Sequence, residues 1–181
     1  MNHDSHEDRH LAYIAQSSPS DSQSSDETGF LAFHPRLTSL FLEGESPSWK
    51  SRLVRLYFFA MTRGKLWIAY ARSTDNQLMH TSCVVPRCFK FPFLGKNDFE
   101  IGPCLTYPEF RRQGLYVQAL RYIARTIGNS VGQPSHCYMF VRESNIASVK
   151  GIERAGFSCI GTAEKSRWLK IYRLKRDNIN D

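Results

Sequence analysis

The clearest hydrophobic pattern in the chain spans residues 112–127, where apolar residues recur every three or four positions. Polar residues fill the intervening positions, so a helix formed here would have one apolar and one polar face. The pattern predicts a helix over this span. A second helix is predicted from an N-cap at Ser144 to Ala155, because Gly156 then supplies a residue that commonly ends helices.

Seven short runs are rich in β-branched and aromatic residues, which is the composition typical of strands. Polar turns separate the first three runs, so these predict an antiparallel meander. One short helix is predicted before them at residues 35–42, with Pro35 as its first residue. Residues 86–97 fit either a strand or a loop. The predicted strands are residues 52–60, 66–72, 77–85, 98–106, 136–141, 157–161 and 167–174.

The order of these elements is a meander followed by strand, helix, strand, helix and two strands, which predicts one mixed α/β (α+β) sheet. The helix at 112–127 would connect two parallel strands by a crossover. Within strand 98–106, Gly102 and Pro103 interrupt the pattern, and proline lacks the N–H that a sheet requires. We therefore expect a bulge or a splayed edge at this point of the sheet.

Residues 1–29 differ in composition from the rest of the chain. They contain seven Ser, six acidic residues and a single short apolar stretch at residues 11–15. Burial of this small apolar surface cannot offset the conformational entropy that the segment would lose on ordering. We therefore predict a disordered tail at residues 1–29 and one folded domain at residues 30–181. His3, His6 and His10 lie in this tail without a fixed geometry, and the five cysteines form no CxxC pair, so no metal site is predicted.

The formal net charge is +7, but the first 29 residues carry six acidic residues and one Arg, so residues 30–181 hold 23 basic and 11 acidic residues, a net charge of +12. A basic surface attracts nucleic acid, anionic lipid or a nucleotide-like cofactor. The longest apolar runs have six residues, against about 20 for a membrane-spanning helix, and the first residues lack the apolar stretch of a secretory signal. We expect a cytoplasmic protein without a membrane partner.

A strand, a turn and the start of a helix follow one another at residues 98–116. The N-terminus of a helix presents unpaired backbone N–H groups and the positive end of the helix dipole. Gly114 would let a ligand approach the backbone closely, and Arg111 and Arg112 add charged donors. These features suit a phosphate or pyrophosphate. A surface turn with a solvated basic pair is the alternative, and the local sequence leaves both open.

Two segments resemble the signatures of the GNAT N-acetyltransferase superfamily. Arg111-x-x-Gly114-x-Tyr116 is similar to the acetyl-CoA pyrophosphate loop of that family, (Q/R)-x-x-G-x-(G/A). Residues 145–157 resemble its second signature, in which an Asn, here Asn145, opens a helix that ends in Gly-Phe. The resemblance covers about residues 98–161. It implies a single GNAT-like domain whose sheet is splayed at an acetyl-CoA site.

The resemblance also implies roles for individual residues. The loop would supply backbone amides for the pyrophosphate, and the splayed strand would pair with pantetheine. Glu100 would be the catalytic general base for an attacking amine, with an ordinary strand carboxylate paired to an Arg as the alternative. The implied cofactor-binding residues are Leu105, Thr106, Arg111, Arg112, Gln113, Gly114, Leu115, Tyr116 and Asn145.

The chain departs from the family pattern at two positions. Tyr116 stands where the loop usually ends in Gly or Ala, and this places bulk beside the phosphates. Ile152 stands where the second helix usually carries the Tyr that protonates the departing thiolate, so the usual general acid is absent. Tyr116, Tyr138 and Tyr172 are the alternatives for that role, and the sequence does not choose among them.

The function that the resemblance implies is transfer of an acetyl group from acetyl-CoA to a primary amine of a small molecule. Parts of residues 81–116 look similar to bacterial GNAT proteins of polysaccharide biosynthesis and amino-sugar pathways, which favours an amino sugar or a nucleotide-linked amino sugar. A protein or peptide N-acetyltransferase is one alternative. A non-catalytic, degenerate GNAT fold that binds CoA or nucleic acid is another, although nucleic acid is the less favoured partner. A homodimer is left open.

Overall fold

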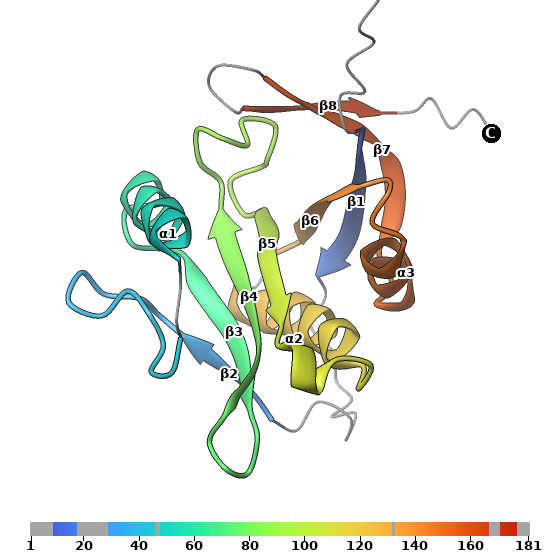
Figure 1. The fold of residues 1–181 in the computed structure, drawn as a ribbon. Coiled ribbons are helices and arrows are strands. Elements are labelled where there is room, and N and C mark those ends of the chain that lie inside the picture. The colour runs from blue at the N-terminus through green and yellow to red at the C-terminus, as the bar shows by residue number, and fades with distance from the viewer. Residues whose placement is uncertain (1–8, 18–28, 46–47, 132, 167–170, 177–181) are drawn as a thin grey trace, which may run out of the picture.

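The computed structural model of the protein describes residues 9–17, 29–45, 48–131, 133–166 and 171–176. Its centre is one eight-stranded mixed sheet in the order β2-β3-β4-β5-β6-β1-β7-β8 (Figure 1), which confirms the predicted α/β class. The strands are β1 (His10–Ser17), β2 (Phe30–Phe33), β3 (Trp67–Arg72), β4 (Leu78–Pro86), β5 (Phe99–Thr106), β6 (Ser135–Arg142), β7 (Ser158–Lys165) and β8 (Tyr172–Arg176). The helices are α1 (Trp49–Met61), α2 (Leu115–Val131) and α3 (Ile146–Arg154), with a 3₁₀ turn, η2, at Pro108–Phe110.

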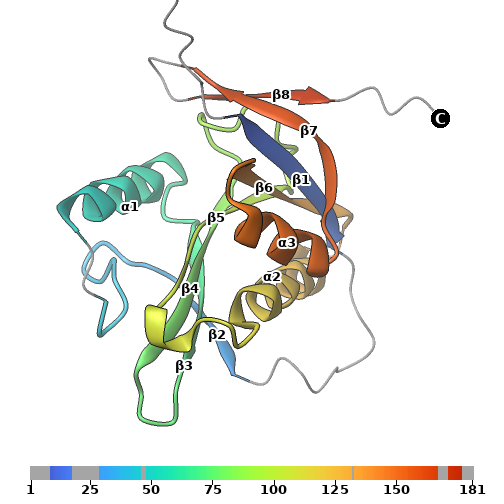
Figure 2. The ribbon, with the colours of Figure 1, turned by 45° about the vertical axis from the view of Figure 1, so that its right-hand side comes forward.

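Strands β2 to β5 run antiparallel in sequence order, and β5 then pairs in parallel with β6. Helix α2 connects these two parallel strands and forms the predicted crossover. Figure 2 shows α2 and α3 side by side over the sheet, with α1 well apart from them. The chain thus places two helices next to the point where the sheet changes from antiparallel to parallel pairing.

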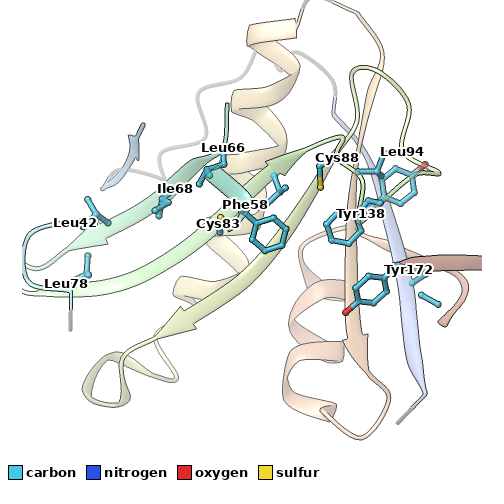
Figure 3. Close-up of a cluster of buried hydrophobic side chains, with 14 residues drawn as sticks. Leu42, Phe58, Leu66, Ile68, Leu78, Cys83, Cys88, Leu94, Tyr138 and Tyr172 are labelled. Atoms are coloured by element: carbon cyan, nitrogen blue, oxygen red, sulfur yellow. The ribbon is translucent and has the colours of Figure 1, made fainter. Parts of the chain in front are cut away.

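The two faces of the sheet carry separate hydrophobic clusters, because neighbouring strand residues point to opposite faces. On β4, Val84 packs in the cluster that includes α2 and α3, while Cys83 packs in the cluster that includes Phe58 of α1. Figure 3 shows this α1-face cluster. The connection between β4 and β5, which the sequence left as strand or loop, is a loop that buries Phe91 and Leu94 in it.

Most predicted elements are confirmed with small changes of boundary. β3 to β7 match five of the predicted strands, and α2 matches the predicted helix but begins at Leu115. Asn145, not Ser144, is the N-cap of α3, because the Asn145 Oδ1 accepts a hydrogen bond from the Ser148 N–H at 3.3 Å. β8 matches the end of the last predicted strand, and residues 167–170 of that prediction lie outside the described residues.

The predicted strand at residues 52–60 is wrong, because this segment forms helix α1. Aromatic and β-branched residues suggested a strand, but the apolar residues recur at helical spacing from Trp49 onward. The Ser48 side chain caps the helix by accepting a hydrogen bond from the Ser51 N–H at 3.3 Å. The predicted turn after it is the end of the helix, where the Gly64 N–H donates to Phe59 O at 2.8 Å.

The predicted helix at residues 35–42 is also wrong. Arg36 and Ser39 exchange two backbone hydrogen bonds, at 3.0 and 2.9 Å, and close a tight turn with Leu37 exposed at its tip. The antiparallel meander therefore consists of β2, β3 and β4. In it, β2 pairs with β3 and takes the place that was expected for residues 52–60. A proline that fits the first position of a helix fits a turn equally well, and this led to the error.

Part of the predicted disordered tail forms a central strand. β1 pairs along its length with β6 on one side and pairs with β7 on the other, and Ala12 and Tyr13 are buried. The prediction is thus wrong for residues 10–17, while residues 1–8 and 18–28 lie outside the described residues. Composition averaged over 29 residues concealed the apolar stretch at residues 11–15, which is long enough for a strand.

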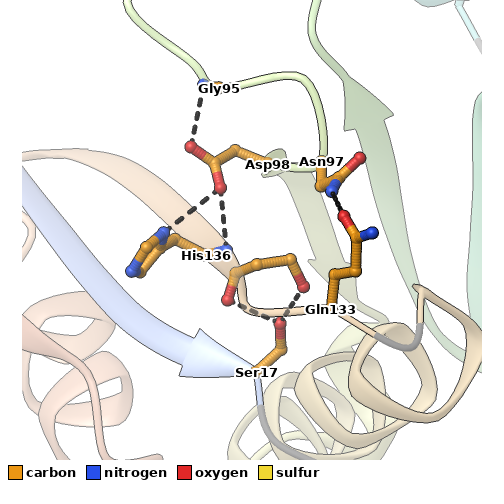
Figure 4. A network of polar contacts seen from close by, with 7 residues as sticks. Ser17, Gly95, Asn97, Asp98, Gln133 and His136 are labelled. Carbon is orange, nitrogen blue, oxygen red and sulfur yellow. Dashed lines mark hydrogen bonds and ion pairs between the residues drawn. The ribbon is translucent and has the colours of Figure 1, made fainter.

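A polar network joins the starts of β5 and β6 (Figure 4). The Asp98 carboxylate accepts hydrogen bonds from the Gly95 N–H at 2.8 Å and from the His136 N–H at 2.9 Å. The same carboxylate lies 3.2 Å from the His136 Nδ1. Because it bonds to the backbone on both sides, this carboxylate fixes the two strands together at the end where they pair.

Removal of residues 1–17 deletes β1, so we expect the shortened chain to lose its cooperative unfolding transition. Without β1, both β6 and β7 would expose unpaired backbone groups on facing edges. A domain is stable by only about 5–15 kcal/mol, so the loss of a central strand is expected to remove that stability. Thermal unfolding followed by circular dichroism checks this. A matched chain lacking only residues 1–8 retains β1 and should still unfold cooperatively, and equal behaviour of the two chains would contradict the prediction.

Candidate active site

The site begins where β5 and β6 separate. The two strands form only two register pairs, Phe99 with Cys137 and Glu100 with Tyr138. Gly102 and Pro103 follow one residue later, and the register of β5 against β4 shifts at the same place. This confirms the predicted irregularity at these residues. Beyond it, the edges of β5 and β6 that face each other no longer pair, so their backbone groups are available to a ligand.

A cleft of about 1050 Å³ occupies the region between the separated strands. Residues 101–106 of β5 form one wall and residues 139–142 of β6 form the other. The start of α2 and the inner side of α3 close its ends through Gly114, Tyr116, Ser148 and Gly151. β5 precedes the crossover helix α2 and β6 follows it, so the two walls lie at opposite ends of the crossover connection. Where their pairing stops, a binding site opens between the two strands.

The loop before α2 directs backbone N–H groups toward this cleft. The first hydrogen bond of the helix runs from the Gln118 N–H to Gly114 O at 3.1 Å, so the N–H groups at the start of α2 lack acceptors within the helix. Arg112 and Gly114 both have positive φ, 64° and 75°, which turns the chain sharply into the helix. The Arg111 Nε donates to Thr106 O at 3.3 Å and ties the loop to the end of β5. Such an arrangement suits a phosphate.

The charge of the cleft is strongly positive. No Asp or Glu lines it in the described part of the chain, whereas five cationic side chains do: Arg111, Arg112, Arg142, Lys150 and Arg154. A second groove of about 690 Å³ shares Gly114, Val117 and Arg154 with the cleft and adds Arg121 and Arg125. Both hollows therefore suit a ligand with several negative charges.

Tyr116 crosses from the start of α2 to α3. A Cβ atom on Gly151 would lie 2.7 Å from the Tyr116 Cδ1, so the ring lies directly against the Gly151 backbone. Burial raises the pKa of the Tyr116 hydroxyl well above its usual value, the neighbouring Cys104 raises it further, and a hydrogen bond with Ser148 partly opposes this. The hydroxyl thus stays protonated and lies between β5 and α3.

His80 lies behind the cleft wall and is fully buried. One ring nitrogen lies 2.7 Å from the Thr106 Oγ1 and the other 2.7 Å from the Ser82 Oγ. Burial lowers the pKa of His80 to about 4, so the ring is neutral at neutral pH and satisfies both hydroxyls. This histidine braces β4 against the end of β5 and holds the Thr106 side chain in one orientation.

Glu100 is buried at the last paired position before the strands separate. Its Oε2 has no hydrogen-bond partner, and its Oε1 would lie 2.8 Å from a Cβ atom on Gly102, a residue of the cleft wall. Burial raises the pKa of Glu100 from 4.5 to about 8, while the positive charge of Lys90 lowers it. An unpaired carboxyl group with a pKa near neutrality suits proton transfer.

Most of the residues that the sequence singled out come together at the cleft. Leu105, Thr106, Arg111, Arg112, Gly114, Leu115, Tyr116 and Asn145 all line it. Gln113 belongs to the loop but not to the lining, and Glu100 lies behind the wall at Gly102. The sequence analysis missed Ser148, Gly151 and the basic residues of β6 and α3. For the residues of α3, the signal was their spacing of three to four residues on the helix that Asn145 opens, whereas nothing local marked Arg142 of β6.

No protein-family model matches the chain, and no curated protein matches it in sequence. Three solved structures share its architecture over 83 % of its length. The fold is that of the GNAT acetyltransferases. One neighbour is a GNAT-family acetyltransferase from Colwellia psychrerythraea (16 % identity, TM-score 0.53), a second is a GNAT-family protein from Novosphingobium aromaticivorans (18 %, 0.50), and a third is a GCN5-related N-acetyltransferase from Sphaerobacter thermophilus (10 %, 0.51).

The chain spans 52 %, 59 % and 48 % of those three GNAT chains, so it corresponds to roughly half of their length. In the ranges that the structure describes, no three His, Cys, Asp or Glu side chains are grouped as a metal would require. None of the helices described is long and apolar enough to cross a membrane.

The variant Glu100→Gln tests whether this carboxyl group is buried as described. Between pH 4.5 and about 8 the folded protein keeps a proton on Glu100 that the unfolded chain has released, so Glu100 makes stability fall as pH rises through this window. His80 acts in the opposite direction, but only between about pH 4 and 6.5. We therefore expect Glu100→Gln to be more stable than the wild type at pH 8.5, with a smaller difference at pH 5.

Free energies of unfolding from urea titrations at the two pH values measure this difference. Glu164→Gln is the matched control, because Glu164 is an exposed carboxylate on β7 beside Lys175. Its effect on stability sets the baseline, because it removes a carboxylate from an exposed position. If Glu100→Gln and Glu164→Gln respond to pH in the same way, Glu100 does not titrate as proposed.

Proposed function

We propose that the protein is an N-acetyltransferase that moves an acetyl group from acetyl-CoA to a primary amine of a small molecule. The observation that carries the proposal is the cleft between β5 and β6, which is lined by the first residues of α2 and by five cationic side chains. The hydrogen-bond donors of the loop suit a pyrophosphate, and the unpaired strand edges suit an extended arm that contains amides. A ligand that carries both groups therefore fits the cleft. The GNAT fold supports this assignment.

The residues present fit acetyl-CoA. Backbone amides at Gln113, Gly114, Leu115 and Tyr116 would bind its pyrophosphate, and the arginines of the adjoining groove would face its remaining phosphate. Bound acetyl-CoA supplies an activated acetyl thioester. The edge of β5 at Leu105 and Thr106 would hold the pantetheine arm and offer strand amides to the carbonyl oxygen of the thioester.

The attacking amine must be neutral, so its proton needs an acceptor. Glu100 is the group suited to this, since its carboxylate is unpaired, has a pKa near neutrality and lies directly behind Gly102. It would accept the proton on Oε2, the oxygen without a partner. Lys90, whose charge lowers the pKa of Glu100, favours the ionised form that accepts a proton.

Tyr116 is our candidate for the group that gives a proton to the departing thiolate. Tyr138 and Tyr172 belong to the cluster on the α1 face (Figure 3), whereas Tyr116 lines the cleft. Ile152, at the family's usual position for this tyrosine, is fully buried in the other core cluster. A tyrosine reaching the cleft from α2 could therefore replace the one that α3 lacks.

For the acceptor we propose a small amine with negative charge elsewhere, because the surface of residues 30–181 is basic and repels cationic lysine-rich peptides. A nucleotide-linked amino sugar meets this description through its phosphates, and amino sugars as a class agree with the resemblance of residues 81–116. A protein or peptide acceptor is the less favoured alternative. A cytoplasmic location remains a prediction of the sequence.

The second candidate function is a non-catalytic module that keeps the GNAT fold. Ile152 favours it, since the usual general acid is missing from α3. Such a module could use the basic cleft for CoA or for nucleic acid. Titration with short single-stranded DNA at two salt concentrations separates the nucleic-acid version, because phosphate contacts make binding steeply salt-dependent.

Acetyl-CoA should raise the thermal stability of the protein. A ligand present at about 100 times its Kd adds roughly 2.7 kcal/mol, which is about 5–10 °C in melting temperature for a chain of this size. The variant Gly114→Trp should lose this increase, because a large side chain at this position would obstruct the loop amides. A thermal-shift titration with acetyl-CoA measures both proteins.

Gly44→Trp is the matched control for this titration. Gly44 and Gly114 have similar positive φ values, 81° and 75°, so a side chain strains the backbone equally at both sites. Gly44 does not line the cleft, so its variant should melt earlier than wild type yet keep the full increase with acetyl-CoA. No increase for folded wild-type protein would reject the acetyltransferase proposal.

The variant Tyr116→Phe should lower kcat and leave the KM for acetyl-CoA nearly unchanged. General acid catalysis typically contributes about 10²–10⁴ in rate, and the phenyl ring keeps the packing against Gly151. Release of the CoA thiol with a panel of amino sugars measures both constants. Tyr122→Phe, on the same helix but outside the cleft, should keep full activity. Equal kcat for Tyr116→Phe and wild type would exclude Tyr116 as the acid.

A further inference from the structure

Helix α1 turns its apolar side to the solvent. Eleven large hydrophobic residues are exposed in the described part of the chain, and six of them lie on this one helix of 13 residues. At about 100° per residue, these six fall within an arc of roughly 160° on one side of the helix. We call them the α1 stripe: Trp49, Leu53, Val54, Leu56, Tyr57 and Met61, with exposed fractions of 40–67 %.

The inward side of α1 is the less apolar one, and specific contacts fix it there. Phe58 is the only buried residue of the helix. The Arg55 guanidinium donates to both oxygens of Glu45, at 2.6 and 2.9 Å, and lies 4.6 Å from the Phe41 ring. Both charged side chains are largely shielded from solvent. Rotation of α1 to bury its stripe would break this shielded ion pair, which is costly, so the stripe stays exposed.

An exposed apolar stripe of this size marks an interaction surface that another segment or molecule buries. The long segments outside the structure, residues 1–8 and 18–28, contain no Val, Ile, Leu, Phe, Trp or Tyr, so neither provides a matching surface. A second copy of this chain presents the same exposed apolar residues, so it offers a matching surface.

We propose that the α1 stripe is a homodimer interface, in which two α1 helices pack antiparallel about a two-fold axis. An isologous contact requires a self-complementary surface, and the six side chains of the stripe are all apolar or aromatic, with Lys50 as the one charged residue among them. Trp, Tyr and Met, three of the residue types enriched in interfaces, are all present in it. Antiparallel packing places Lys50, in the first turn of one helix, beside the last turn of the other. That last turn carries no basic residue of its own, so Lys50 would complement its helix dipole.

A lipid surface fits the stripe less well than a second copy. A helix that lies on a membrane carries its basic residues along the borders of the apolar face. In α1, Lys50 projects between Tyr57 and Met61 within the apolar arc and Arg55 is bound to Glu45 on the opposite side, so Arg52 is the single basic residue of the helix at a border of the stripe. The inference is independent of the proposed function, because the stripe and the cleft share no residue.

Sedimentation of the full chain tests the proposal. At about 100 µM, well above a micromolar Kd, we expect a species with twice the 20.9 kDa mass of one chain. The double variant Leu53→Glu, Tyr57→Glu should sediment at the mass of one chain. Both side chains are exposed in the single chain, so circular dichroism should show that the variant is folded.

Ile146→Glu is the matched control. Ile146 is also an exposed large hydrophobic residue, but it lies at the start of α3, far from α1 (Figure 1). This variant should remain dimeric. A monomeric wild type at 100 µM overturns the proposal, and so does a dimer that the double variant leaves intact. If the monomeric wild type instead co-sediments with phosphatidylserine vesicles and the double variant does not, the stripe binds membranes and the proposal is wrong.

Discussion

The parallel contact between β5 and β6 is limited to two residue pairs, and the rest of the site depends on this limit. At one end, Asp98 fastens the starts of the two strands through backbone hydrogen bonds. At the other, Gly102 and Pro103 stop the pairing. A longer contact would close the sheet and leave α2 and α3 over a continuous surface. A shorter one would free the strands altogether. The length of this contact therefore sets both the existence and the width of the cleft.

The two faces of the sheet offer different electrostatic environments to the same short strand. On one face, β5 meets helix N-termini and arginines, so negative charge is favoured there. On the other, Glu100 is buried, and Lys90, 4.6 Å from the Phe58 ring, is the positive charge that opposes the effect of burial on its pKa. Because strand residues alternate between faces, β5 can present an anion site and a proton acceptor within a few residues. A helix could not separate them so sharply.

The sequence was most informative where local patterns and tertiary structure agree. The periodicity of α2 and the Gly-Pro interruption in β5 each had a direct physical meaning, and both features are present. It was least informative where the tertiary structure overrode local preference. α1 carries aromatic and β-branched residues that favour strands, and an ion pair from Arg55 to Glu45, ten residues away, orients it. Glu100 could be named from the sequence, but its burial and the missing hydrogen-bond partner of its Oε2 arise from tertiary packing, which no local pattern predicts.

The position of β1 has a consequence for biosynthesis. β1 leaves the ribosome well before its partners β6 and β7, since Ser17 meets Ser135 across 118 residues of sequence. Until then its apolar residues have no place in a sheet, and pairing must close a very long loop. Contacts of such sequence separation slow folding. The sheet therefore cannot close until β6 and β7 have left the ribosome, and until then the growing chain carries β1 as an unpaired strand.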